Sequence, residues 1–146
     1  MTMPTLDAVL DGIEGVLDGA VGLVQSQTYD KLTEGIPETP LLQVHPASGQ
    51  PDQLETYTKF RVERLVVYAD LYARQRSNMR DDMAKVVEMA QAMLVIIRAE
   101  DVGHTNFGVT GIHSWDWSWE RVQFDYGDTK VKYAGIRFTF NVWIHP

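Results

Sequence analysis

The chain has 146 residues, of which 45% are hydrophobic and 23% are charged, as in an ordinary globular protein with one core. It contains no cysteine, which excludes disulfides and cysteine-ligated zinc. The longest apolar run, "MLVII" at 93–97, is too short to span a bilayer, and the start "MTMPTLDAVLDG" lacks the basic region of a signal peptide. We therefore expect a single domain over 1–146 that neither enters a membrane nor is exported.

The net charge of −7 is unevenly distributed. Residues 1–58 hold nine acidic residues and one basic residue, Lys31, whereas the rest of the chain is nearly neutral. The main group of bases comprises Lys59, Arg61, Arg64, Arg74, Arg76 and Arg80. It has two interpretations, a solvated strand face with its loop or a surface that follows a phosphate backbone, and we favour the first because a charge run alone is weak evidence.

A first helix is predicted over 6–24, with Thr5 as its N-cap and an apolar stripe at helical spacing. An acidic stripe runs along a second face and consists of Asp7, Asp11, Glu14 and Asp18. A third face carries Gly12, Gly15, Gly19 and Gly22, which are costly inside a helix. Either another backbone approaches this face closely, from a neighbouring subunit for example, or the helix is marginal and tolerates the glycines.

Two strands are predicted next. After a region rich in proline and glycine, "LLQVH" at 41–45 is expected to form a short strand at a sheet edge. Residues 55–73 are expected to form a long strand, because Thr58, Phe60, Val62, Val66 and Tyr68 share one parity and Arg64 alone interrupts the series.

A second, longer helix is the clearest element. Asn78 is a suitable N-cap, Asp81 and Asp82 suit the positive end of the helix dipole, and Gly103 follows the last turn as a terminator. The apolar stripe is Met79, Met83, Val86, Val87, Ala90, Met93, Leu94 and Ile97. Its methionines suit an adaptable binding groove, but core packing is the favoured interpretation at this spacing.

The C-terminal part predicts a long β-hairpin in which Trp115, Trp117 and Trp119 share one face. The apolar parity changes after Trp119, and it changes again on the returning strand before Ile136. With a two-residue loop at Gly127–Asp128, the two changes lie opposite each other, which indicates a bulge or bend crossing both strands. We then expect Trp119, Trp117 and Trp115 to pair with Ile136, Phe138 and Phe140 under the helices, rather than to form an exposed recognition platform.

Residues outside this core face are candidates for contacts with other subunits. Trp143 lies off the core face near the chain end, and the hairpin tip is expected to project from the body. The candidate interface residues are therefore Tyr126, Asp128, Lys130, Trp143, Arg61, Arg64, Arg74 and Arg76, with the acidic stripe of the first helix facing a channel or a neighbour.

No motif for catalysis or cofactor binding is present. The sequence has no glycine-rich phosphate loop, no Gly-x-Ser-x-Gly and no His-Glu-x-x-His, and its four histidines are scattered. A metal site would need His104, His113 and Asp116 to converge, which is a remote expectation. We expect no cofactor, no metal and no enzymatic activity.

The order of these elements resembles that of a known family. An acidic helix is followed by a loop with a short strand, the long strand "TYTKFRVERLVVYADLYA", an amphipathic helix, and a hairpin ending "YAGIRFTFNVWIHP". This order resembles the tail terminator and tail-completion proteins of long-tailed bacteriophages, the lambda tail terminator superfamily. The resemblance implies an α+β fold, in which two main helices pack against a small antiparallel or mixed sheet that includes the long C-terminal hairpin.

The same resemblance implies a structural virion protein. It would form a homo-oligomeric ring, six-membered in the family, at the head-proximal end of the tail tube. The ring's partners would be the tail tube protein and the head–tail connector, and the genome DNA would pass through without specific binding. Two alternatives remain, a head–tail connector or head-closure protein and a non-enzymatic acidic binding module with an aromatic face.

Overall fold

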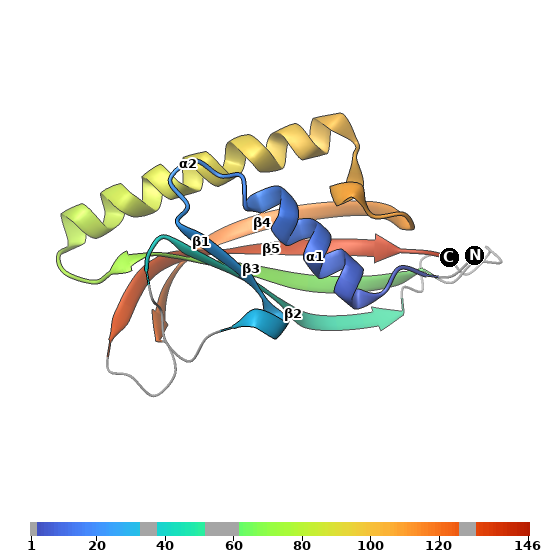
Figure 1. Cartoon of the computed structure of the whole chain (residues 1–146), viewed down its shortest axis with the longest axis horizontal. Coiled ribbons are helices and arrows are strands. Elements are labelled where there is room, and N and C mark those ends of the chain that lie inside the picture. The colour runs from blue at the N-terminus through green and yellow to red at the C-terminus, as the bar shows by residue number, and fades with distance from the viewer. Residues whose placement is uncertain (1–2, 33–37, 52–61, 126–130) are drawn as a thin grey trace.

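The computed structural model describes residues 3–32, 38–51, 62–125 and 131–146. Its helices and strands are α1 (Leu6–Leu17), β1 (Gln25–Thr28), β2 (Leu41–Pro51), β3 (Glu63–Gln75), α2 (Met79–Gly103), β4 (Ile112–Asp125) and β5 (Lys132–Ile144) (Figure 1). The described strands form one five-stranded sheet in the order β1-β2-β3-β5-β4. β1 is parallel to β2, and all other neighbours are antiparallel. The α+β fold with a mixed sheet and a C-terminal hairpin is thereby confirmed.

Both helices lie on the same side of the sheet (Figure 1), and the main core fills the space between. Val9, Leu10, Ile13 and Leu17 of α1 are fully buried, as are Met89, Met93 and Ile97 of α2 and Ile136, Phe138 and Phe140 of β5. Burial of each such side chain contributes roughly 1.5–3 kcal/mol, so these residues supply most of the driving force for this layered arrangement.

The ends of α1 follow from local chemistry. Thr5 Oγ1 accepts a hydrogen bond from Ala8 N at 3.1 Å, which confirms the N-cap. The helix ends at Leu17, seven residues before the predicted end at 24, and the chain then turns through Gly22 at φ +89°. Gly22 suits this turn because glycine tolerates a positive φ.

The predicted four-glycine face is therefore only half helical. A Cβ on Gly12 would lie 2.6 Å from Val109 Cγ2 and 2.9 Å from the carbonyl oxygen of Phe107, whereas a Cβ on Gly15 would meet nothing within 4 Å. The close approach expected of this face occurs at Gly12, and the approaching segment belongs to the same chain.

α2 begins and ends where the sequence predicts. Asn78 Oδ1 accepts a hydrogen bond from Asp81 N at 2.9 Å, and the helix ends at Gly103, with His104 in the left-handed region at φ 53°. The buried face is Val86, Met89, Ala90, Met93 and Ile97. Met79 and Val87, which were expected in the same stripe, are 61% and 49% exposed. The predicted stripe is thus correct for Val86, Ala90, Met93 and Ile97, and wrong for Met79 and Val87.

The prediction for β2 needs correction, and the structure shows which face of β3 is covered. β2 extends from Leu41 to Pro51 and lies inside the sheet, because β1 pairs with its first four residues. In β3 the odd-numbered Val67, Ala69, Leu71 and Ala73 face the helices, and the even-numbered Val66 and Tyr68 lie on the opposite face, where they are partly buried, as the interruption of their series by Arg64 suggested. The predicted start of this strand, 55–61, lies outside the described residues.

The hairpin register differs from the predicted one by two residues. Trp119 pairs with Phe138 and Trp117 with Phe140, and the register is continuous from Ser114 to Asp125. No β-bulge interrupts the pairing of β4 with β5 between these two residues. The irregularity lies instead between β3 and β5, where Tyr72 pairs with Gly135 and Arg74 with Ala134.

The change of parity marks a change of sheet face. Val122 and Phe124 of β4 pack with Leu41, Tyr72 and Tyr133 in a small second cluster on the face away from the helices. Phe124 lies over Gly135, where a Cβ would be 2.5 Å from its Cε2 atom, and its ring centroid is 4.5 Å from that of Tyr72. The apolar side chains of β4 therefore change from one face of the sheet to the other without an inserted residue in its pairing with β5.

The three tryptophans follow the core face only in part. Trp115 and Trp117 are half-buried against the main core, and the Trp115 ring lies 4.6 Å from that of Phe107. Trp119 is 47% exposed. The prediction that these residues lie inside is met in part by the half-buried Trp115 and Trp117, and it is wrong for Trp119, which lies on the outermost strand.

Candidate assembly surface

The outer edge of β4 has no partner strand among the described residues. Such an edge presents backbone N–H and C=O groups that can pair with another chain. At the opposite side β1 covers only Leu41–Val44, so the rest of β2 also lacks a described neighbour on that side. Pro46 and Pro51 have no N–H to donate, whereas β4 contains no proline. β4 is therefore the more available of the two edges.

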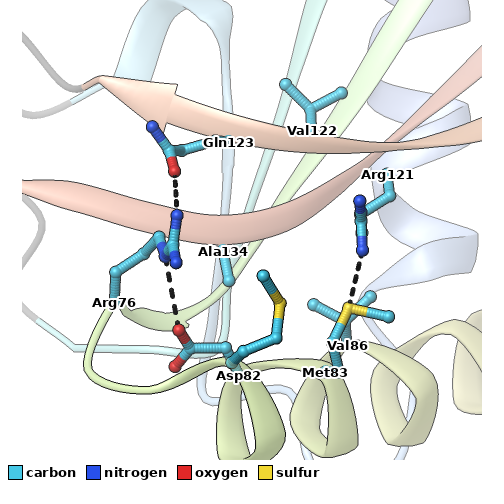
Figure 2. Close-up of a pocket in the computed structure, with 9 residues that line it drawn as sticks. Arg76, Asp82, Met83, Val86, Arg121, Val122, Gln123 and Ala134 are labelled. Atoms are coloured by element: carbon cyan, nitrogen blue, oxygen red, sulfur yellow. Dashed lines mark hydrogen bonds and ion pairs between the residues drawn. The ribbon is translucent and has the colours of Figure 1, made fainter.

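A groove of about 190 Å³ lies between the first turns of α2 and the ends of β4 and β5. Its apolar side chains are Met79, Met83, Val86 and Ala134, and its polar side chains are Arg76, Asp82, Arg121 and Gln123 (Figure 2). Val122 borders it from β4, with its side chain directed to the other face of the sheet. Met79 and Met83 are flexible and polarizable, so the groove can adapt to the shape of a bound segment.

Asp82 holds one end of this groove together. It is 3% exposed, and its carboxylate lies 3.3 Å from both Arg74 Nε and Arg76 Nε. The backbone N–H of Ser77 also donates to it at 3.3 Å, and Arg76 donates to Gln123 on β4. A buried carboxylate needs such partners. Asp82 is thus an ion-pair centre as well as a first-turn acid, and Arg74 and Arg76, predicted as interface residues, are engaged within the subunit.

Arg121 stands at the other end of the groove and differs from the other two arginines. Its Nη1 atom lies 2.9 Å from the sulfur of Met83 (Figure 2), and no carboxylate pairs with it among the residues described. A thioether is only a weak acceptor. The positive charge of this exposed side chain therefore remains available to an acidic group from outside the subunit.

The acidic stripe of α1 lies beside β1, at the far edge of the sheet from β4. Ser26 of β1 donates hydrogen bonds to Glu14 and, at 2.7 Å, to Asp18, and the Tyr29 hydroxyl donates to Asp7. This bond to Asp7, followed by desolvation and by the charges of nearby acids, raises the pKa of Tyr29 to about 12. Asp11 is exposed. The stripe remains a negatively charged edge, because only neutral hydroxyls donate these bonds.

The sheet face away from the helices carries a polar cluster centred on Asp70. Asp70 accepts hydrogen bonds from Arg137 Nε at 2.8 Å and Nη2 at 3.1 Å, and His45 Nε2 lies 2.8 Å from it. The Arg137 guanidinium also lies 4.1 Å from the ring centroid of Tyr68. Burial alone would raise the pKa of Asp70, but the bonds to His45 and Arg137 outweigh burial and hold the pKa below its ordinary value. These residues tie β2, β3 and β5 together.

The remaining predicted interface residues divide into two groups. Arg64 and Trp143 pair directly across β3 and β5 on the face away from the helices, and both are half-buried. Arg64 Nε is buried and has no hydrogen-bond partner in the described part of the chain. Arg61, Tyr126, Asp128 and Lys130 lie outside the described residues, so the predicted projecting tip is not located.

The three residues considered for a metal do not converge. His104 and His113 line the same shallow hollow, whereas Asp116 accepts a hydrogen bond from Asn141 on the other face of the sheet. Within the described ranges, no group of three or more histidine or acidic residues has the geometry to bind a metal. Neither described helix has the length and apolar character needed to cross a bilayer.

One interpretation of the methionines in α2, an adaptable binding groove, agrees with the positions of Met79 and Met83, whereas the place of Arg121 in this groove was not anticipated from the sequence. Its signal was the alternation on β4, where Arg121 continues the odd-numbered series of the tryptophans. That series places a charge at the helix-facing side of an edge strand. No protein-family model matches the sequence, and no curated protein matches it.

Proposed function

We propose that this protein is a structural subunit of a long-tailed bacteriophage that assembles into a ring at the head-proximal end of the tail tube. As a tail terminator it stops polymerisation of the tube and presents the surface to which the head–tail connector docks. The order of helices and strands, which resembles that of the tail terminator superfamily, supports this proposal.

One observation on the subunit carries the proposal furthest. The two outer edges of the described sheet are unlike each other, since α1 places acids beside β1, and Arg121 on β4 has no carboxylate partner among the described residues. Contacts between unlike surfaces are heterologous, and heterologous contacts close into rings when the rotation between copies permits. A protein built to join its own copies needs such a pair of edges and needs no catalytic site.

The genome must pass through this ring without being retained. With a net charge of −7, the subunit does not favour tight contact with phosphates. The ring's partners are then proteins, namely its own copies, the tube protein and the connector, and its place is the virion.

The test is to image the purified protein by electron microscopy, alone and mixed with tail tubes that lack a terminator. We expect rings at one end of each tube and tubes that no longer elongate when more tube protein is added. Binding to DNA-filled heads with no binding to tubes would favour the head-closure alternative. A protein that binds neither would contradict the proposal.

A further inference from the structure

We infer that the groove between α2 and β4 receives the acidic edge of a second copy, formed by α1 and the turn at 18–24. The inference rests on the proposed function, since it assigns the contact between neighbours in the ring. Four observations carry it: the length over which α2 and β4 run side by side, the charge of Arg121, the character of the opposite edge, and the directions of the strands.

α2 and β4 lie near each other beyond the cavity itself. At one end Arg121 of β4 contacts Met83 of α2, and at the other Trp115 of β4 packs on Phe107, whose N–H donates to Glu100 of α2. About 25 Å of helix and about 20 Å of strand lie between these points. The two elements therefore run side by side over this distance, with the exposed Trp119 and Val87 within it and the exposed Met79 just beyond the Arg121 end.

The chemistry of this strip calls for an occupant that is both acidic and apolar. Arg121 has no carboxylate partner in the described part of the chain, while Met79, Val87 and Trp119 leave apolar surface in water. Exposed apolar surface beside an unpaired guanidinium is typical of a protein interface, in which aromatic residues, methionine and arginine are enriched.

The opposite edge of the same subunit has this complementary character. Its acids are Asp7, Asp11, Glu14 and Asp18, and Val21, in the turn that follows, is 85% exposed. Val24, at the end of that turn, is exposed as well. A carboxylate and a protruding aliphatic side chain thus lie within a few residues of each other.

The topology places donor and receptor where a single copy cannot join them. α1 packs on β1 and β2, and β4 is the last strand at the other side of the sheet. β4 runs antiparallel to β1 and β2, as the alternation through β3 and β5 requires. Copies set edge to edge with their helices on one side therefore bring α1 of one copy beside α2 and β4 of the next.

This contact is heterologous, which distinguishes it from a symmetric dimer through two β4 edges. In a symmetric contact the same surface of both copies meets, and the acidic edge stays free. In the heterologous contact every copy uses both edges, and the chain of copies ends only when the ring closes.

Cross-linking tests the geometry cleanly, because the chain contains no cysteine. The variants are Val21→Cys, Val87→Cys and the double variant, each treated with a short bismaleimide at concentrations where the protein assembles. We expect a ladder of covalent oligomers from the double variant and almost none from either single variant. Efficient dimers from Val87→Cys alone would overturn the inference in favour of a symmetric contact. An assembled double variant that does not cross-link would overturn it as well.

Charge reversal tests the energetics. Arg121→Glu is expected to weaken association by about tenfold or more in light scattering, and Asp11→Lys in the same chain is expected to restore part of it. Glu120→Lys, on the neighbouring position of β4 but the other sheet face, is the matched control and should leave association unchanged. Association of Arg121→Glu at the wild-type level would overturn the inference.

The two proposals fail in different ways. Rings on tail tubes that form equally well with Arg121→Glu would remove the inference and leave the proposed function. A cross-linked head-to-tail oligomer that does not bind tail tubes would support the inference and contradict the proposed function. A protein that stays monomeric alone and with tubes would contradict both.

Discussion

Arg137 on β5 binds Asp70 on β3 through two of its nitrogens, at 2.8 and 3.1 Å, on the sheet face that carries neither helix. Asp70 is 3% exposed, so its charge depends on this guanidinium and on His45. A paired charge in the middle of a sheet fixes the register of three strands at once.

Replacement of Arg137 by alanine should lower the free energy of unfolding by roughly 2–4 kcal/mol, because it leaves a buried carboxylate with one partner fewer. The partial exposure of the arginine keeps this loss below that of a fully buried pair. Chemical denaturation measures it. Arg121→Ala is the control, because Arg121 has no acidic partner among the described residues, and its effect should stay within about 0.5 kcal/mol. Equal losses in the two variants would contradict the assignment.

The stabilisation from Asp70 should depend on pH in the acid range. Its pKa is lower in the folded protein than in the unfolded chain, where an aspartate has a pKa of about 3.9. The contribution is therefore complete above the unfolded value and is lost as the pH falls through the folded value. Unfolding curves from pH 7 to pH 2 should show the loss in the wild type, and Asp70→Asn should lack this component. A parallel pH dependence in both proteins would argue against it.

Tyr29 should ionise about two pH units later than an ordinary tyrosine, at a pKa of about 12. Because the folded pKa is raised, the contribution of the neutral hydroxyl is present below pH 10 and is lost as the pH rises towards 12. Ultraviolet titration of the phenolates measures this, and Tyr29→Phe identifies the signal. Asp7→Asn should bring the pKa back towards 10, since the hydrogen bond to Asp7 is its largest cause. No change in Asp7→Asn would disprove that cause.

Two glycine-to-alanine substitutions should have opposite signs. A Cβ on Gly135 would overlap the carbonyl oxygen of Leu71 and lie 2.5 Å from Phe124 Cε2. Gly135→Ala should therefore lower the free energy of unfolding by about 1–3 kcal/mol. Gly15 lies in α1 with open space around it, and alanine there should stabilise by up to about 1 kcal/mol through helix propensity. Thermal unfolding separates the two, and a stable Gly135→Ala variant would contradict the packing of Phe124.

Trp117 and Trp119 should respond differently to truncation. Trp117→Ala removes a half-buried ring packed on the core and should cost about 2–4 kcal/mol, towards the lower end for large-to-small changes. Trp119→Ala should cost less, because this ring is 47% exposed, and should instead weaken association between copies. Unfolding and light scattering on both variants check this. Trp119→Ala with the larger loss of stability would place this ring in the core.

The sequence alone determined the features that depend on near neighbours in the chain. Thr5 and Asn78 cap their helices through bonds to residues three positions away, and Gly103 ends α2, so these boundaries follow from local chemistry. The C-terminal hairpin was equally predictable, because alternating apolar residues on both sides of a turn signal leave few other structures.

Only the tertiary structure decided which surfaces meet. The parity of β3 fits either face, and Val67 rather than Val66 is inside because the helices cover that side. The hairpin register is likewise not set by the apolar pattern, since Trp119 pairs with Phe138, two residues from the predicted partner Ile136, and the pattern fits both registers. Ion pairs between distant positions, such as Asp70 with Arg137, and the position of Arg121 over Met83 arise only once the strands are ordered. Periodicity determines which residues share a face, but the packing of one element on another determines what each face contacts.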